Sequence, residues 1–111
     1  MLRLALIAIL LLCSGACENA SPIPPLVAGL SDGEATEARF DARIKKHFAV
    51  GTSVRSLLDE LRSQGFEVKP AYDMADYRIG DGFCEIVWSV RWRAKGGKLL
   101  EAAGLHFQRC P

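Results

Sequence analysis

The last third of the chain alternates apolar and polar residues on both sides of a Gly-Gly pair. From Cys84 to Trp92 every second residue is apolar, which is typical of a half-buried β-strand. Gly96-Gly97 supplies the positive φ angles that a tight hairpin turn needs, and a second strand is predicted over residues 99–109. This hairpin is the strongest strand signal in the sequence, so the fold is expected to contain an antiparallel sheet.

Cys84 and Cys110 lie close to direct opposition across this hairpin. Residues that face each other across a turn at Gly96-Gly97 have numbers that sum to 193, whereas the two cysteines sum to 194. A three-residue loop or a β-bulge at Gly104 would remove the difference, and cysteines placed opposite each other can reach bonding distance. We therefore expect a Cys84–Cys110 disulfide; the alternative is a pair of reduced, buried thiols.

Two amphipathic helices are predicted before the strands. Ser31 and Glu34 fit a capping box, and apolar residues then recur at helical spacing, which predicts a helix over residues 32–48. A second helix is expected to begin after Thr52 or Ser53. Its buried stripe consists of Val54, Leu57, Leu58 and Leu61. The helix is expected to end at Gly65, with Phe66 in contact with Leu61.

The second helix leads into the sheet. Residues 66–69 alternate and predict a short strand that Pro70 ends or confines to an edge. Residues 71–82 are expected to be mostly loop, although residues 77–79 could pair briefly. The predicted fold class is therefore α+β, with two N-terminal helices packed on one face of a three- to four-stranded antiparallel meander sheet and a disulfide-closed C-terminal hairpin.

The first 16 residues have the pattern of a signal peptide. Arg3 provides a positive start, residues 4–12 are an unbroken apolar run, and small residues precede Cys17. The run is too short to span the roughly 30 Å of hydrocarbon in a bilayer, and no polar residue gives it an amphipathic face. We expect export of the chain and removal of residues 1–16.

Residues 14–17 (SGAC) resemble the bacterial lipobox, in which the cysteine is lipidated and becomes the new N-terminus. Ser14 stands where the lipobox usually has leucine, and the same residues also satisfy ordinary signal peptidase. If Cys84 pairs with Cys110, ordinary cleavage leaves Cys17 as an odd thiol in an oxidising compartment. We expect acylation of Cys17 and attachment to the periplasmic face of the inner or outer membrane; the alternative is a soluble periplasmic or secreted protein.

Residues 17–30 follow the expected cleavage site. They contain three prolines without a consistent period, which disfavours a helix and keeps a chain extended. The segment is therefore predicted to be a tether between the lipid-anchor cysteine and a single domain over residues 31–111.

The order of helix, helix and three antiparallel strands in an exported lipoprotein of this size resembles the BamE (SmpA/OmlA) outer-membrane lipoproteins. It is also similar to the half-domain of β-lactamase inhibitory proteins. The likeness covers about residues 32–110 and is carried by residues 48–53 (FAVGTS) with Val54, Leu58 and Leu61 behind them. The chain departs from the family's Leu-Gly-x-Pro helix ending and adds the cysteine pair. The resemblance implies an α+β fold and a place in the cell envelope, and no partner-binding residue of the family transfers by position.

Charge and residue types exclude several classes of function. The chain has 14 basic and 13 acidic residues, and loss of Arg3 with the leader leaves a neutral protein, which is not expected to bind nucleic acid. The spacing of the sequence indicates no serine and aspartate that would form a catalytic triad with His47 or His106. A zinc site needs three or four ligands, and these two histidines with scattered acids do not supply them. Three acids of one predicted loop lack the EF-hand order that calcium requires and are expected to be solvated: Asp73, Asp76 and Asp81. We expect a protein that is not an enzyme and uses no cofactor or metal.

The predicted hairpin offers the candidate contacts for a partner. The segment after residue 82 has more cations than anions, so one hairpin face is expected to be mildly basic, as a solvated face or a docking site. Trp88 and Trp92 fit either a core beneath the helices or an interface, and Arg91 and Arg93 alternate with them and point away from that core. Because arginine is enriched at interfaces, these two arginines are the predicted contacts. Two functions fit: a lipid-anchored protein-interaction module of the envelope with an unidentified partner, or a small secreted inhibitor or immunity-type protein that binds one enzyme.

Overall fold

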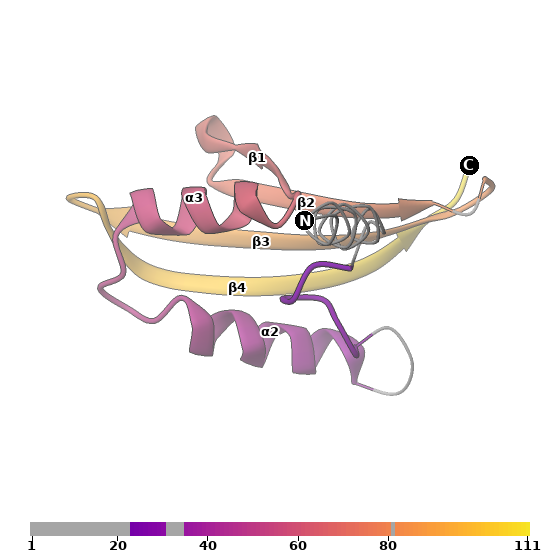
Figure 1. Ribbon diagram of the computed structural model, residues 1–111, viewed down its shortest axis with the longest axis horizontal. Coiled ribbons are helices and arrows are strands. Elements are labelled where there is room, and N and C mark those ends of the chain that lie inside the picture. The colour runs from indigo at the N-terminus through magenta and orange to yellow at the C-terminus, as the bar shows by residue number, and fades with distance from the viewer. Residues whose placement is uncertain (1–22, 31–34, 81) are drawn as a thin grey trace, which may run out of the picture.

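The computed structural model describes residues 23–30, 35–80 and 82–111. Within these ranges two helices precede a four-stranded antiparallel sheet, so the fold is α+β, as predicted. In Figure 1, α3 crosses in front of β2 and β3 while α2 lies along β4. No helix among the described residues is both long and apolar enough to cross a membrane. The elements in chain order are α2 (Thr36–His47), α3 (Val54–Ser63), β1 (Glu67–Lys69), the short 3-10 helix η2 (Pro70–Tyr72), β2 (Met74–Gly80), β3 (Glu85–Lys95) and β4 (Lys98–Arg109).

The core lies between the two helices and one face of the sheet. Phe40 of α2 is fully buried and meets the ring of Trp88 edge-on, with the centroids 5.1 Å apart. Trp88 and Trp92 are 0% and 5% exposed, so both tryptophans belong to the core and neither is free to form an interface. Burying aromatic side chains of this size is the largest single stabilising contribution in a small core.

The first helix is shorter than predicted. It begins at Thr36 because Ala35 adopts a left-handed conformation with φ of 59°, which is unfavourable for alanine and cannot continue a right-handed helix. The predicted capping box of Ser31 and Glu34 lies outside the described residues. The helix ends at His47, one residue before its expected end.

Both ends of α3 follow local sequence signals. The side chain of Ser53 accepts a hydrogen bond from the Ser56 N–H at 3.1 Å, which confirms the predicted cap. At the other end Gly65 has φ of +87°, and the Phe66 N–H donates to the Leu61 carbonyl at 3.0 Å. These contacts form the predicted Schellman ending, which turns the chain directly into β1.

Most of the loop predicted for residues 71–82 is strand β2. Asp73 takes a left-handed conformation with φ of 52° after η2, and seven residues of β2 then pair with β3. The loop prediction was wrong. Aspartate is typical of turns, but Asp76 lies within β2 and is only 5% exposed. The sheet therefore has the order β1-β2-β3-β4, with β1 pairing only the first three residues of β2.

The hairpin turn and the disulfide are confirmed. Gly96 and Gly97 have φ of 60° and 76°, and Cys84 is bonded to Cys110 with their Cα atoms 4.3 Å apart. The bulge that brings the cysteines into register is at Leu100, not at Gly104, because the pairing shifts between Arg93 and Ala94. If Leu100 paired with Arg93 without a bulge, every later side chain of β4 would point to the other face of the sheet.

Residues 23–30 pack against the domain, so the predicted tether does not include them. Leu26, Val27 and Leu30 are at most 4% exposed and belong to the hydrophobic core. The side chain of Gln64 accepts a hydrogen bond from the Leu26 N–H, and Arg43 Nη1 donates to the Ala28 carbonyl at 2.7 Å. Prolines that prevent a helix still permit this turn, and the apolar residues beside them supply the burial.

Candidate functional site

The sheet has one face under the helices and one face that no helix covers among the described residues. Strand alternation and register place side chains of all four strands on this second face, which we call the open face. It includes both predicted contact residues. Its members are Glu67, Lys69, Met74, Asp76, Arg78, Gly80, Glu85, Val87, Ser89, Arg91, Arg93, Lys95, Lys98, Glu101, Ala103, Leu105, Phe107 and Arg109.

One half of the open face, away from the tip of the β3–β4 hairpin, is occupied by ion pairs within the protein. The Asp76 carboxylate lies 3.6 Å from both Lys69 Nζ and Arg78 Nη2. The same two cations also reach Glu67, at 4.0 and 3.7 Å. At the disulfide end, Arg109 approaches Glu85 at 3.5 Å. The positive charges of this half are therefore balanced by carboxylates of the protein itself.

The ion-paired half contains two buried polar atoms that have no hydrogen-bond partner among the described residues. They are Oδ1 of Asp76 and Oγ of Ser89, and the two residues face each other in the β2–β3 register. The sequence analysis expected Asp76 in a solvated loop with Asp73 and Asp81. The structure instead buries Asp76 and leaves Asp73 at the end of η2, while Asp81 lies outside the described residues.

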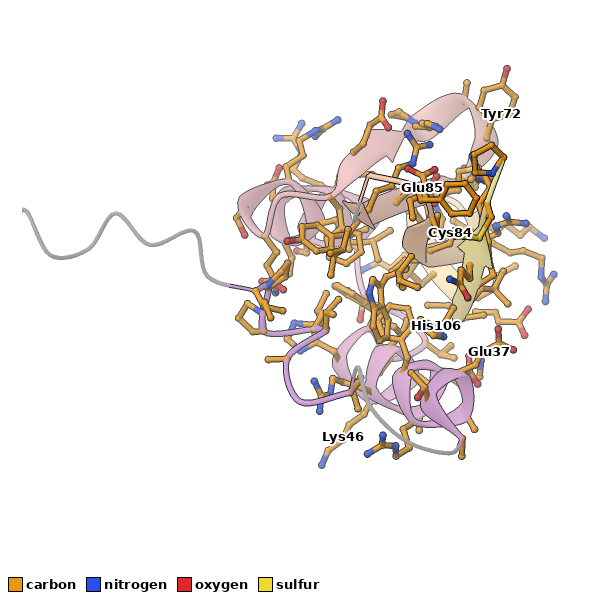
Figure 2. All side chains as sticks on the ribbon, turned by 90° about the vertical axis from the view of Figure 1, so that its right-hand side faces the viewer. Glu37, Lys46, Tyr72, Cys84, Glu85 and His106 are labelled. Carbon is orange, nitrogen blue, oxygen red and sulfur yellow. A yellow bond between two sulfur atoms is a disulfide. The ribbon has the colours of Figure 1, made fainter. Side chains whose placement is uncertain are left out.

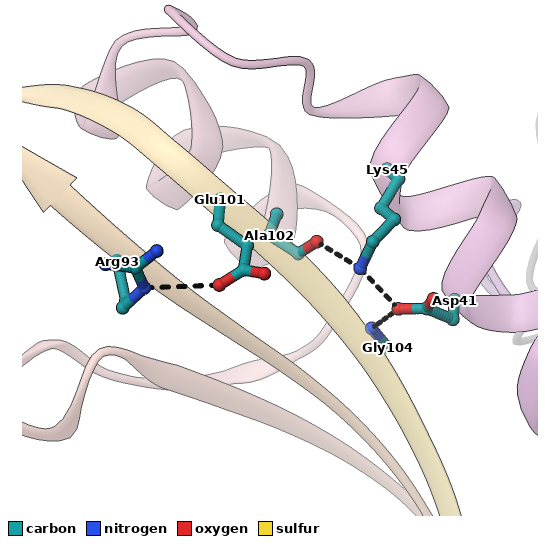
Figure 3. A network of polar contacts seen from close by, with 6 residues as sticks. All are labelled: Asp41, Lys45, Arg93, Glu101, Ala102 and Gly104. Atoms are coloured by element: carbon teal, nitrogen blue, oxygen red, sulfur yellow. Dashed lines mark hydrogen bonds and ion pairs between the residues drawn. The ribbon is translucent and has the colours of Figure 1, made fainter.

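The other half of the open face, at the tip of the β3–β4 hairpin, has a different charge balance. Arg91 is exposed and makes no ion pair or side-chain hydrogen bond with a described residue. Arg93 is also exposed, and its Nε donates to Glu101 at 3.2 Å (Figure 3). Lys95 and Lys98 are exposed, face each other in register and have no ion pair within the described residues. We call these four cations and Glu101 the hairpin cluster.

A second polar feature, which the sequence analysis missed, protects the outer edge of β4. Glu37, Asp41 and Lys45 recur every fourth residue on α2 and bond to alternate residues of β4; Figure 3 shows Asp41 and Lys45. Asp41 accepts a hydrogen bond from the Gly104 N–H at 2.9 Å, and Lys45 Nζ donates to the Ala102 carbonyl at 3.0 Å. These side chains hydrogen-bond to edge backbone groups of β4 that could otherwise pair with a strand of another chain.

The third contact of this series lies at the start of α2. Glu37 accepts a hydrogen bond from the His106 N–H at 3.0 Å, and Figure 2 shows the two residues side by side. Four helical residues rise about 6 Å, and two strand residues rise about 6.8 Å. The spacing of the three side chains therefore matches the strand, although no local signal in the sequence predicts that α2 lies next to β4.

The pKa of the Asp41 carboxyl is lower in the folded protein than its usual value. Burial raises the pKa of its carboxyl, but the hydrogen bonds from the Gly104 N–H and Lys45, together with the charge of Lys45, outweigh burial and lower it. A lowered pKa in the folded state means that Asp41 stabilises the fold above the pKa of the unfolded chain, about 3.9. This contribution is lost as the pH falls through the folded-state pKa.

We therefore expect Asp41→Asn to remove an acid-sensitive part of the stability. At neutral pH the variant should be less stable by about 1 kcal/mol, since a charge-assisted hydrogen bond and an ion pair are weakened. The gap to the wild type should close as the pH falls from about 5 to 2, measured by urea unfolding at each pH. Asp59→Asn, at an exposed α3 residue, is the control; an Asp41 gap that is independent of pH would contradict this assignment.

Neither histidine belongs to a metal-binding cluster within the described residues. His47 lies 3.9 Å from Glu60 on the surface, and the ring of His106 packs on Trp88 with centroids 4.3 Å apart. The described residues contain no group of three or more histidines, cysteines or acids that could hold a metal ion. The predicted lipidation residue, Cys17, lies outside the described residues.

Two hollows flank the sheet. One, of about 450 Å³, lies against the disulfide and is lined by Phe83 and by the Glu85–Arg109 pair. The other, of about 330 Å³, lies at the bulge, where Val50 and Leu100 are exposed above Phe48. The first hollow contains the Glu85–Arg109 ion pair, and the second includes Arg93 and Glu101 of the hairpin cluster.

No family model, curated protein or solved structure matches this chain. The resemblance to the BamE lipoproteins therefore stays a prediction.

Proposed function

We propose that this protein is a non-enzymatic module of the bacterial cell envelope that binds another protein through the open face of its sheet. The observation that carries the proposal is the division of the sheet into a face covered by both helices and a face that no helix of the described residues covers. On the open face Arg91 is exposed and has no partner within the described chain. Exposed arginines beside partly buried apolar residues, here its register partners Met74 and Ala103, are common in protein interfaces.

The place of the protein in the envelope is part of the same proposal. It is supported by the signal-peptide pattern of residues 1–16 and by the odd cysteine, Cys17, that remains once Cys84 and Cys110 are paired. Acylation of Cys17 would hold the domain at the periplasmic face of a membrane. Incorporation of labelled fatty acid into the wild type and its loss in Cys17→Ala test the anchor; equal labelling of both proteins would refute it.

The structure makes Arg91 a sharper test residue than the predicted pair. Arg93→Glu would place a carboxylate directly opposite Glu101 and would destabilise the sheet by like-charge repulsion. Arg91 is paired in register with Met74 and Ala103, so its reversal introduces no such repulsion across the strands. Arg91→Glu should therefore leave thermal stability almost unchanged.

The experiment is cross-linking of the protein in the intact envelope, identification of the linked partner, and titration of the two purified proteins. We expect Arg91→Glu to weaken binding about tenfold or more, with a smaller effect at high salt. Arg55→Glu, an exposed reversal on α3, is the matched control and should bind normally. If no linked protein binds directly once purified, or if Arg91→Glu binds as tightly as the control, the proposal fails.

A further inference from the structure

The hairpin cluster is unbalanced in a way that the rest of the open face is not. It contains four cations, Arg91, Arg93, Lys95 and Lys98, and one acid, Glu101. Every basic residue elsewhere on the open face is within 4.0 Å of a carboxylate. Unpaired positive charge on this face is therefore concentrated at the distal part of one hairpin.

Two of these cations are arranged unfavourably for the isolated protein. Lys95 and Lys98 face each other directly across the hairpin, and like charges at such positions destabilise a sheet. Arg93 is only partly compensated, because Nε alone contacts Glu101 and its two terminal nitrogens have no hydrogen bond within the described residues. An anionic group placed over the cluster would remove this repulsion.

The spacing of the cations favours one kind of anionic partner. Arg91, Arg93 and Lys95 are alternate residues of β3 and project from one face, about 6.8 Å apart. An extended peptide projects alternate side chains at the same spacing. Arginine donates two parallel hydrogen bonds to a carboxylate in a planar, bidentate geometry. Partly buried apolar residues on the same face, Met74 and Ala103, would contact the intervening peptide side chains, whereas a lipid surface offers no fixed spacing.

From this charge complementarity we infer that the hairpin cluster binds an extended, acidic segment of the partner protein, with acidic residues at alternate positions. The inference rests on the proposed function and specifies the chemistry of the partner at that site. The acidic side chains would pair with Arg91, Arg93 and Lys95, and Lys98 would add to the attraction from the opposite strand.

The inference is tested with a synthetic peptide in which glutamate and serine alternate, titrated into the protein purified from the envelope. A peptide of the same composition with its glutamates in one block is the comparison, and phosphatidylglycerol vesicles are the membrane probe. We expect the alternating peptide to bind more tightly than the block peptide, and to be weakened by salt. The triple variant Arg91→Gln, Lys95→Gln, Lys98→Gln should lose about tenfold in affinity for it.

The matched control is Lys46→Gln, Arg55→Gln, Arg62→Gln, which removes the same charge from exposed positions on the helices. It should change the affinity less than twofold. Equal loss in both triple variants, or equal binding of both peptides, would show attraction by net charge alone and would overturn the inference. So would vesicle binding without peptide binding. These results do not affect the cross-linking and titration of the partner protein. The inference of an acidic segment can therefore fail while the proposed function holds.

Neutralising the hairpin cluster also has an expected effect on the free protein. Because the variant removes the Lys95–Lys98 repulsion, its melting temperature should equal or slightly exceed that of the wild type. A clear loss of stability would show that these cations are structural and would likewise overturn the inference.

Discussion

Replacing Gly104 by alanine is expected to destabilise the protein by about 2 to 3 kcal/mol, because α2 packs directly on this residue of β4. A Cβ atom at Gly104 would lie 2.7 Å from Phe40 Cδ2 and 3.1 Å from the Cα of Asp41. Phe40 is fully buried with its ring against Trp88, so displacing it would disturb that contact. Moving α2 away would lengthen the hydrogen bond from the Gly104 N–H to Asp41.

Gly80→Ala is the matched control for this prediction. Gly80 is also a strand glycine without a positive φ, and nothing lies within 4 Å of a Cβ atom built on it, so its substitution should be nearly neutral. Phe40→Leu combined with Gly104→Ala should cost less than the sum of the two single changes, since the smaller side chain removes part of the clash. Urea unfolding measures all four proteins; equal stabilities of the two alanine variants would refute the close approach of α2.

The elements that could be predicted from the sequence are those specified by neighbouring residues. The cap at Ser53, the ending at Gly65 and the turn at Gly96-Gly97 each depend on a few adjacent residues, and all three are present. The disulfide followed from the same local logic, since a defined turn fixes which residues lie opposite each other. The one-residue discrepancy was real, but the bulge that resolves it is at Leu100, where no glycine marks it.

The features that could not be predicted depend on contacts between distant segments. Asp76 has the residue type of a turn, and only its position between Lys69 and Arg78 explains a buried carboxylate in β2. The burial of Leu26 depends on Gln64 and on an arginine of α2 that binds the surrounding carbonyls. Both the edge contacts of α2 and the imbalance of the hairpin cluster require the register of β4, which the position of the bulge decides.

The disulfide is expected to make a large contribution to stability. Replacing both cysteines, as Cys84→Ser with Cys110→Ser, should lower the free energy of unfolding by about 3 to 4 kcal/mol, the entropy model's value for a loop of this length. The bond joins residues 26 apart, at the end of a ladder in which Glu85 already pairs with Arg109. The native hairpin should therefore persist without the bond, and most of the loss should arise from the freer unfolded chain.

A bond that acts on the unfolded chain can be distinguished by experiment from one that supports the folded hairpin locally. The double serine variant should keep the circular dichroism and tryptophan fluorescence of the wild type at low temperature, since Trp88 and Trp92 stay buried. Its urea midpoint should match that of the reduced wild type, because both lack the same cross-link. For the Gly104→Ala protein, by contrast, reduction should add its full cost to that of the clash, as the two sites lie on different parts of β4. If the serine variant were as stable as the oxidised wild type, the cross-link would not restrict the unfolded chain, and the helix-to-sheet core would have to supply the stability assigned here to the bond.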